Sequence, residues 1–472
     1  MAKLRTHVVC SCVVLLAWLG LHGCGDDSAK PTPGKRRDAG GQMDTDASVD
    51  GSSGEDKDGS MAGGDGGPGG RDAGPGSDDD GGPAADGGKP GSEPEACELS
   101  DDANSFAVDV PFSNDASYSV TKGSTGFGVA FHGMGCDGLE VMPVHSAGAF
   151  ASPTKLLDDC VSVRDVSLLH VPTGWRLVWV DNSASSGAEL QSMLVSENMS
   201  GSVGELRTRI TDNAMLEQRP MLATVDGKPF LAFIAGDDAQ GTRRISTLVM
   251  DDKSALKDLL PDTKARKPNN LTLAQVGKDR VAVVWVEEQG MPGIWLQTTD
   301  LTGAAQGDPV QITELGSAGT AIDLATRDIG DGGALLYSVA IGGVNNEVRM
   351  RRIGPMGELV SDERKVVGAP LQGRDASFAR LGGGYVVAYR ALPGGPITSS
   401  EVRITFISKE GNQQHDAQGQ LLTYKIADAS AGGGRVTVRV SNDGQLLVGF
   451  VDQAAGGGRV LRLVRKRLDC AL

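Results

Sequence analysis

Histidine and aromatic residues are scarce in this 472-residue chain, and their scarcity narrows the chemistry it can perform. It has six His, five Trp and five Tyr, and aromatic residues make up 4% of the whole. The His residues beyond the first hundred positions are scattered without metal-ligand spacing, at His132, His145, His170 and His415. Gly-x-Ser-x-Gly, His-Glu-x-x-His and phosphate-binding loop motifs are also missing. The sequence therefore predicts no metal site and no cofactor, and it leaves any catalytic residue unknown.

Large apolar residues are absent from one long segment. Residues 25–96 contain no Leu, Ile, Phe, Tyr or Trp, but 20 Gly, 17 Asp or Glu and 7 Lys or Arg. Such a segment cannot bury enough apolar surface to offset the entropy of ordering, so we predict a disordered tether. Its alternating Asp and Gly could also be read as calcium-binding repeats, but the fixed ligand spacing of a calcium loop is missing.

Excess positive charge is also missing. The segment 25–96 carries a net charge of −10, and with Lys3 and Arg5 ahead of it the remaining sequence keeps −8 of the total −16. A nucleic-acid-binding domain would present a basic face. We therefore expect no nucleic-acid partner.

One hydrophobic run stands at the N-terminus. Two cations precede an apolar run over residues 8–21, which is too short to span a bilayer as a stable helix and is typical of a secretion signal. The run ends in Leu-His-Gly-Cys, and Leu21, Gly23 and Cys24 match a lipobox. In these residues the chain resembles bacterial lipoproteins. The resemblance implies lipidation of Cys24 and a place in the bacterial cell envelope, at the outer membrane facing the periplasm or the cell exterior.

Three parts of the chain follow from these patterns. Residues 1–23 are the expected signal peptide, residues 24–96 the lipid-anchored tether, and residues 97–472 the folded domain. A flexible, Gly-rich coil as long as the tether has an r.m.s. span of roughly 45 Å. That reach is enough to hold the domain clear of a membrane surface.

A short motif recurs along the folded part. Strands rich in β-branched residues each close on an aromatic, and these aromatics are spaced by 48, 54, 52, 52, 52 and 61 residues. The seven are Phe131, Trp179, Phe233, Trp285, Tyr337, Tyr389 and Phe450. Each unit holds four strand-like stretches separated by Gly, Ser or Asn turns, with hardly any helical periodicity. The pattern predicts an all-β, seven-bladed β-propeller with the aromatics in its core, resembling propellers as an architecture without the motifs of the WD40, Asp-box or kelch families.

The last unit is one strand short, which bears on closure of the ring. We predict that an orphan strand over residues 105–112 supplies the missing outer strand. Four Cys remain after the signal and the lipidated residue, and three pairings are open to them from their number alone. Closure of the ring would put Cys97 beside Cys470, which leaves Cys136 to pair with Cys160. Both bridges suit an exported protein.

Cations recur in the loops that enter the innermost strands. They are Arg164, Arg219, Lys267, Arg374 and Arg435, and in a propeller these loops surround one mouth of the central channel. Convergent guanidinium groups would form an anion-binding site. The alternative is that each cation pairs with a local acid such as Asp165 or Asp375.

Two functions are compatible with these residues. The first is a monomeric, membrane-tethered binding or assembly module that recognises an envelope protein or glycan through its loops. The second is a hydrolase or lyase that acts on an anionic polysaccharide at the channel mouth, with Asp165 or Asp375 transferring protons. The fold alone does not choose between them.

Overall fold

In a computed structural model of the chain, all secondary-structure elements assigned among the described residues are β-strands, joined by turns and irregular segments. The structure describes residues 97–470 except 101–105, 113–116, 134–137, 146, 158–162, 183–186, 205–206, 214, 238–241, 251–254, 264–266, 288–291, 315–321, 327–331, 342–344, 369, 393–398, 416–417, 431–432 and 455. The predicted signal peptide and tether, with Cys24, therefore lie outside the described residues.

The first four sheets each contain four antiparallel strands in chain order. Blade 1 comprises β3 (Tyr118–Lys122), β4 (Gly126–His132), β5 (Leu139–His145) and β6 (Thr154–Lys155). Blade 2 comprises β7 (Val163–Val171), β8 (Gly174–Asp181), β9 (Glu189–Val195) and β10 (Thr208–Arg209). Blade 3 comprises β11 (Leu216–Val225), β12 (Lys228–Asp237), β13 (Thr242–Val249) and β14 (Lys257–Thr263). Blade 4 comprises β15 (Pro268–Gln275), β16 (Val281–Glu287), β17 (Gly293–Thr299) and β18 (Ala305–Glu314).

The remaining three sheets complete the ring. Blade 5 comprises β19 (Ile322–Thr326), β20 (Gly333–Ile341), β21 (Asn345–Ile353) and β22 (Arg364–Val367). Blade 6 comprises β23 (Gly373–Leu381), β24 (Gly384–Ala391), β25 (Ser399–Ser408) and β26 (Thr423–Ser430). Blade 7 comprises β27 (Val436–Val440), β28 (Gln445–Gln453) and β29 (Arg459–Asp469), joined by β1 (Glu98–Ser100) and β2 (Phe106–Phe112) from the other end of the domain.

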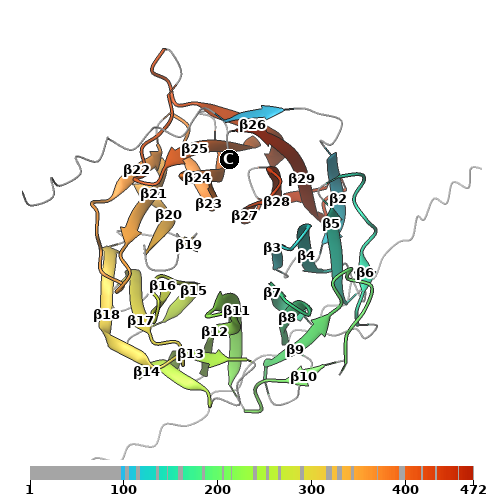
Figure 1. The fold of residues 1–472 in the computed structure, drawn as a ribbon, viewed down its shortest axis with the longest axis vertical. Helices are drawn as coiled ribbons and strands as arrows, with labels where there is room; N and C mark the ends of the chain where they lie inside the picture. Colours follow the sequence, from blue (N-terminus) through green and yellow to red (C-terminus); the bar gives the residue numbers. More distant parts are fainter. Residues whose placement is uncertain are drawn as a thin grey trace, which may run out of the picture. The chain divides into compact units, whose positions relative to one another are not determined.

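The first strand of every blade lies innermost in the ring, next to its central axis (Figure 1). Each of these inner strands contacts the inner strand of the next blade, and β27 of blade 7 contacts β3 of blade 1. The domain is a seven-bladed β-propeller. Because the seven inner strands run in the same direction, their starts gather at one mouth of the channel and their ends at the other. We call these the strand-start mouth and the strand-end mouth.

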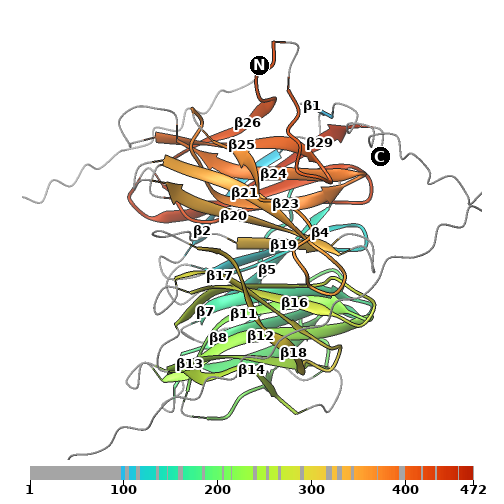
Figure 2. The same cartoon turned by 90° about the vertical axis from the view of Figure 1, so that its left-hand side faces the viewer.

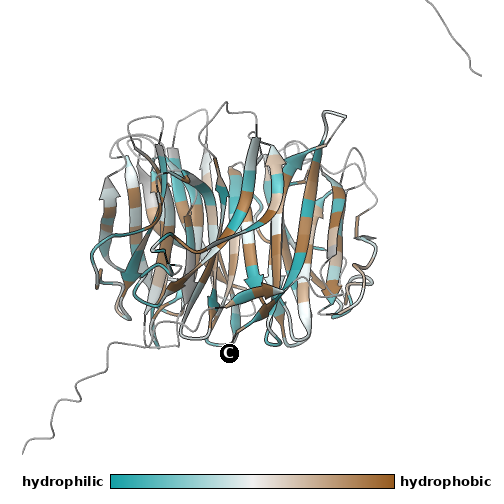
Figure 3. Cartoon of the chain, turned by 90° about the horizontal axis from the view of Figure 1, so that it is seen from above, coloured by the Kyte–Doolittle hydropathy of each residue, from teal (hydrophilic) through white to brown (hydrophobic). Residues whose placement is uncertain are grey.

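The core lies between the blades, in layers that each draw on two neighbouring sheets. Successive side chains of a strand point to opposite faces of the sheet, and in β16 they enter the two layers on either side of blade 4 alternately. Apolar and polar segments are both seen along the upright strands (Figure 3). Each of the seven apolar layers between neighbouring blades contains one of the seven repeating aromatics. All seven aromatic side chains are buried. The prediction that they are core residues is confirmed.

Polar side chains join neighbouring inner strands near the channel, where the strands are too far apart to pair as a sheet. Ser119 Oγ accepts the backbone N–H of Leu168 at 3.1 Å, and Ser167 Oγ accepts that of Leu222 at 3.0 Å. In blade 5 the same role falls to a carboxylate, because Asp323 Oδ2 accepts the N–H of Phe378 at 3.2 Å. One blade thus places a charge where others place a hydroxyl.

Both ends of the folded domain meet in blade 7 (Figure 2). β2 pairs with β29 in antiparallel register from Phe106 opposite Arg465 to Phe112 opposite Arg459, and β1 pairs with the far end of β29. Asp109 on β2 accepts two hydrogen bonds from Arg462 on β29, at 2.7 and 2.9 Å. The contribution of these N-terminal strands to the stability of the ring stays a prediction.

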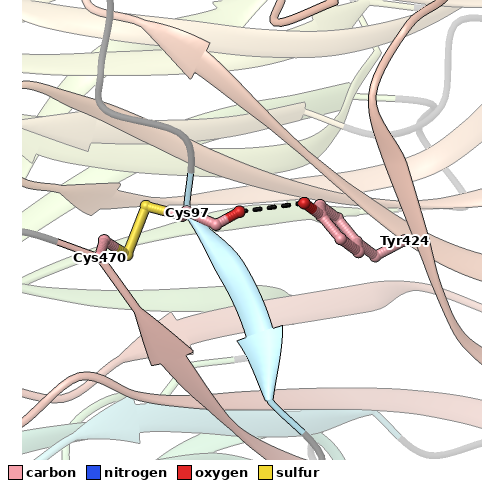
Figure 4. The surroundings of a disulfide bond; sticks show 3 residues. All are labelled: Cys97, Tyr424 and Cys470. Carbon is pink, nitrogen blue, oxygen red and sulfur yellow. Dashed lines mark hydrogen bonds between the residues drawn. A yellow bond between two sulfur atoms is a disulfide. The ribbon is translucent and has the colours of Figure 1, made fainter. Parts of the chain in front are cut away.

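A disulfide joins Cys97 to Cys470, whose Cα atoms are 4.5 Å apart across a sequence separation of 373. Tyr424 of β26 donates a hydrogen bond from its hydroxyl to the carbonyl of Cys97 at 3.1 Å (Figure 4). The predicted pairing of these two Cys is confirmed. The second predicted pair, Cys136 and Cys160, lies outside the described residues.

The described part of the chain has neither a membrane-spanning helix nor a cluster of metal-ligating side chains. It contains no helix with the length and apolarity needed to cross a bilayer. Nor does any group of three or more His, Cys, Asp and Glu side chains in it have the arrangement to hold a metal ion.

Candidate binding site at the strand-start mouth

A cavity of about 460 Å³ lies at the strand-start mouth. Its wall is formed by the inner strands β3, β7, β11, β15 and β23 and by the segment just before β27. β28 and β29 add one residue each. The polar and charged lining residues are Ser117, Tyr118, Asp165, Arg219, Asn269, Asn270, Asp375, Arg435 and Arg459. The wall therefore presents guanidinium groups, carboxylates and amides to one space.

Backbone irregularities occur at this same mouth in four blades. The ladders between first and second strands shift register after Val163, Gln218, Asn269 and Arg374. Three residues at these bulges have positive φ, namely Arg219 (52°), Asn270 (45°) and Asp375 (53°). Such values are uncommon for residues other than glycine, and a β-bulge redirects the side chains beside it. The bulges thus turn polar residues toward the cavity.

Arg219 and Asp165 form the first charged pair of the cavity. Asp165 Oδ2 accepts the backbone N–H of Arg219 at 3.0 Å, and its Oδ1 lies 3.5 Å from Arg219 Nη1. The Arg219 side chain is 48% exposed and that of Asp165 17%. This pair bridges blades 2 and 3 and leaves the guanidinium accessible to a ligand.

Asp375 is the second carboxylate in the wall. Its Oδ2 lies 3.5 Å from Arg374 Nε and 3.8 Å from Arg390 Nε. Burial raises the pKa of the Asp375 carboxyl above its usual range, and the two guanidinium groups oppose that rise. Asp375 therefore holds a proton more readily than an exposed aspartate would.

Arg390 supports this part of the wall from behind. Its side chain is fully buried, and its guanidinium donates to the carbonyls of Ser430 at 2.8 Å, Val451 at 2.9 Å and Gly434 at 3.2 Å. Burial lowers the pKa of Arg390, while the carboxylate of Asp375 opposes that shift. The contacts tie blade 6 to blade 7 and position the segment that carries Arg435.

Arg435 reaches from the strand-start mouth toward the interior of the channel. Its Nη2 lies 4.0 Å from Asp323 Oδ1, and its side chain is 38% exposed. The hydroxyl of Tyr118 lies 2.8 Å from the Arg435 carbonyl and 2.7 Å from that of Gly449. Burial raises the pKa of Tyr118 to about 12, so this phenol stays protonated and acts as a structural donor.

The five cations predicted from the loops are thus placed differently. Arg219 and Arg435 line the cavity, and Arg374 lies behind it against Asp375. Arg164 and Lys267 are not among its lining residues. The register shift in blade 2 points Asp165 rather than its neighbour Arg164 into the cavity. Both acids named from the sequence, Asp165 and Asp375, line the wall.

Sequence reasoning missed other polar residues of the mouth. Asn269 and Asn270 belong to the bulge of β15, and Arg459 begins the third strand of blade 7. An Asn-Asn pair at the start of a strand is itself a signal, since Asn tolerates positive φ better than most residues. Comparison of this position across all units could have revealed it.

The comparisons with known proteins bear on the fold. No protein-family model matches the chain, and no curated protein sequence matches it. A protein of unknown function from Dyadobacter fermentans is 12% identical, with 79% of this chain and 99% of that chain covered at a TM-score of 0.45. The BP39L lectin from Burkholderia pseudomallei is 15% identical, with 75% and 97% covered at a TM-score of 0.47. A GH43 endo-arabinanase from Bacillus licheniformis is 14% identical, with 54% and 95% covered at a TM-score of 0.31. At these values no residue's role is transferred to this chain.

Proposed function

We propose that the propeller is a binding module whose ligand enters the strand-start mouth, and that this ligand is an acidic glycan of the cell envelope. The observation that carries the proposal is the cavity of about 460 Å³, in which Arg219 and Arg435 face the same space as the Asn269 and Asn270 amides. Guanidinium groups recognise planar carboxylates, and amides and carboxylates exchange hydrogen bonds with hydroxyls. A carboxylate-bearing sugar offers both kinds of group.

The setting of the module is part of the same proposal. A lipid on Cys24 and a tether over residues 24–96 would hold a monomeric domain at the bacterial outer membrane, without a nucleic-acid partner. The lipobox residues and the composition of the tether support this setting. An envelope protein that presents a carboxylate in the same geometry is the alternative partner.

A thermal-shift titration tests the binding proposal. The purified chain is mixed with acidic and neutral oligosaccharides at two salt concentrations, and a ligand at 100 times its Kd adds about 2.7 kcal/mol to stability. We expect a salt-sensitive shift with acidic sugars that is weakened in Arg219→Gln and Arg435→Gln. Arg467→Gln is the matched control, since Arg467 pairs with Asp469 near the end of β29 and does not line the cavity. A shift that both mouth variants retain in full would refute the site.

The second candidate is an enzyme that cleaves the bound glycan, and one observation favours it. Asp375 has a raised pKa, as a general acid requires, and Asp165 supplies a second carboxylate in the same cavity. We expect Asp375→Asn to abolish cleavage of the oligosaccharide while the variant still binds it. Oligosaccharides that bind the unmodified chain and stay intact over long incubation would rule this candidate out.

A further inference from the structure

The opposite end of the channel holds a second cavity, of about 370 Å³. It lies at the strand-end mouth, where β3, β11, β15, β19, β23 and β27 contribute to the wall. Its charged lining residues are Lys122, Asp323, Arg380 and Arg439. Among the described lining residues, three cations thus face this cavity with one carboxylate.

The Asp323 carboxylate already accepts hydrogen bonds from the neighbouring blade. Asp323 accepts hydrogen bonds from Ser377 Oγ at 2.6 Å and from the backbone N–H of Phe378 at 3.2 Å. It lies 4.0 Å from Arg435 on one side and 4.0 Å from Arg439 on the other. One negative charge is therefore shared between cations that belong to different mouths.

Two cations of the strand-end mouth, Arg439 and Lys122, lie in surroundings that disfavour their charged forms. Burial lowers the pKa of Arg439, and the neighbouring charge of Arg435 adds to that effect while Asp323 opposes it. Lys122 is exposed, yet desolvation also lowers the pKa of its ammonium, with Asp443 opposing the shift. A bound anion would oppose both shifts further, because it would add negative charge beside both cations.

The two mouths differ in this respect. At the strand-start mouth, Arg219 and Arg374 each lie 3.5 Å from an aspartate oxygen. At the strand-end mouth, the Arg439 guanidinium donates to the carbonyl of Val438 at 2.7 Å and is 4.0 Å from the shared Asp323. The excess of positive over negative lining charge is greater at the strand-end mouth.

We propose that the strand-end mouth is a second ligand site, which binds a carboxylate or phosphate group between Lys122 and Arg439. Arg439 donates to the anion from the channel wall, and Lys122 closes over it from the rim as a flexible point charge. The site uses other cations than the strand-start mouth, and Asp323, 4.0 Å from both Arg435 and Arg439, is the charge that lies between the two sites. Its volume admits a small molecule or the charged end of a larger one.

Isothermal titration of the full chain with inorganic phosphate, and separately with citrate, tests this site. We expect at least one of the two to bind, and whichever binds more tightly identifies the preferred group. Arg439→Gln should weaken that binding at least tenfold, since it removes a charge-assisted donor. Lys122→Gln is the second variant, because an exposed rim residue can be replaced without disturbing the channel.

The control is Arg467→Gln, which changes β29 outside both cavities and should leave phosphate and citrate binding as it was. Arg219→Gln is measured in parallel, because it reports any binding of the same anions at the strand-start mouth. Absence of binding by the unmodified chain at low salt would overturn the proposal. Equal affinity in the unmodified chain, Arg439→Gln and Lys122→Gln would overturn it as well. Binding that is lost only in Arg219→Gln would move the anion to the other mouth and so refute this site.

Discussion

At the scale of single residues, Glu217 in β11 is a buried acid whose protonation is linked to folding. Its side chain is fully buried at the contact between blades 2 and 3, close to the Glu189 carboxylate. Burial raises its pKa from 4.5 to about 7, and the Glu189 carboxylate adds to the rise, whereas Asn213 and Arg244 oppose it. An acid whose pKa is raised by folding stabilises the native state only while it is protonated.

Glu217 therefore makes stability depend on pH in a defined window. The native state binds the extra proton between pH 4.5 and about 7, so the free energy of unfolding should fall by about 3 kcal/mol as pH rises through that window. Glu217→Gln should remove this part of the pH dependence and raise stability at pH 8. Urea unfolding at pH 5 and pH 8 measures both effects. An unchanged difference between the two pH values in the variant would contradict this assignment.

At the scale of elements, the repeating strands are the part of the fold that the sequence predicts best. Seven aromatics spaced by about fifty residues mark β4, β8, β12, β16, β20, β24 and β28, because a core between blades needs one large side chain per repeat. The β-bulges could not be predicted from the sequence, because a register shift depends on how two strands pair in the folded chain. Such a shift moves a side chain to the other face of the sheet. Hence Asp165 lines the cavity, whereas its neighbour Arg164 does not.

The second mouth was missed for a related reason. Arg439 stands within "RVTVRV", where alternation favours an ordinary strand, and Asp323 occupies the place that Ser119 and Ser167 hold in other blades. Neither residue carries a motif. Only the closed ring brings Lys122 of the first blade near Arg439 of the last.

The N-terminal strand β2 gives a prediction at this scale. Its removal exposes the outer edge of β29 and breaks the pair between Asp109 and Arg462. We expect deletion of residues 106–112 to lower the melting temperature, whereas Asp109→Asn alone should cost roughly 0–1 kcal/mol, as for other exposed ion pairs. Differential scanning calorimetry compares the two variants. A deletion variant that melts at the original temperature would show that β2 does not close the ring.

At the scale of the whole molecule, closure depends on the two chain ends. The Cys97–Cys470 disulfide encloses nearly the entire propeller. A cross-link across a long loop removes more conformational entropy from the unfolded chain than one across a short loop. We expect Cys97→Ser with Cys470→Ser to lower the free energy of unfolding by roughly 2–5 kcal/mol. Reductant should abolish this difference in stability between the unmodified chain and the double variant, because it opens the Cys97–Cys470 bridge of the unmodified chain. Equal stability of the two proteins without reductant would contradict a role of the bridge in holding the ring.

Attachment to the membrane is a second prediction at this scale. If Cys24 carries the lipid, Cys24→Ser should transfer the protein from the membrane to the soluble fraction of bacterial cells, because the long polar tether has no other anchor in its sequence. Fractionation followed by detection of the propeller domain measures the change. The double variant of Cys97 and Cys470 serves as a control, since it should stay with the membrane.

The central claim is that an acidic glycan occupies the strand-start mouth, and hydrogen–deuterium exchange of the chain with and without such a glycan tests it most directly. The account predicts slower exchange at the starts of β7, β11, β15 and β27, whose residues line or border the cavity, and unchanged exchange in the outer strands. Slower exchange confined to the outer strands or to the strand-end mouth, with none at the strand-start mouth, would contradict it.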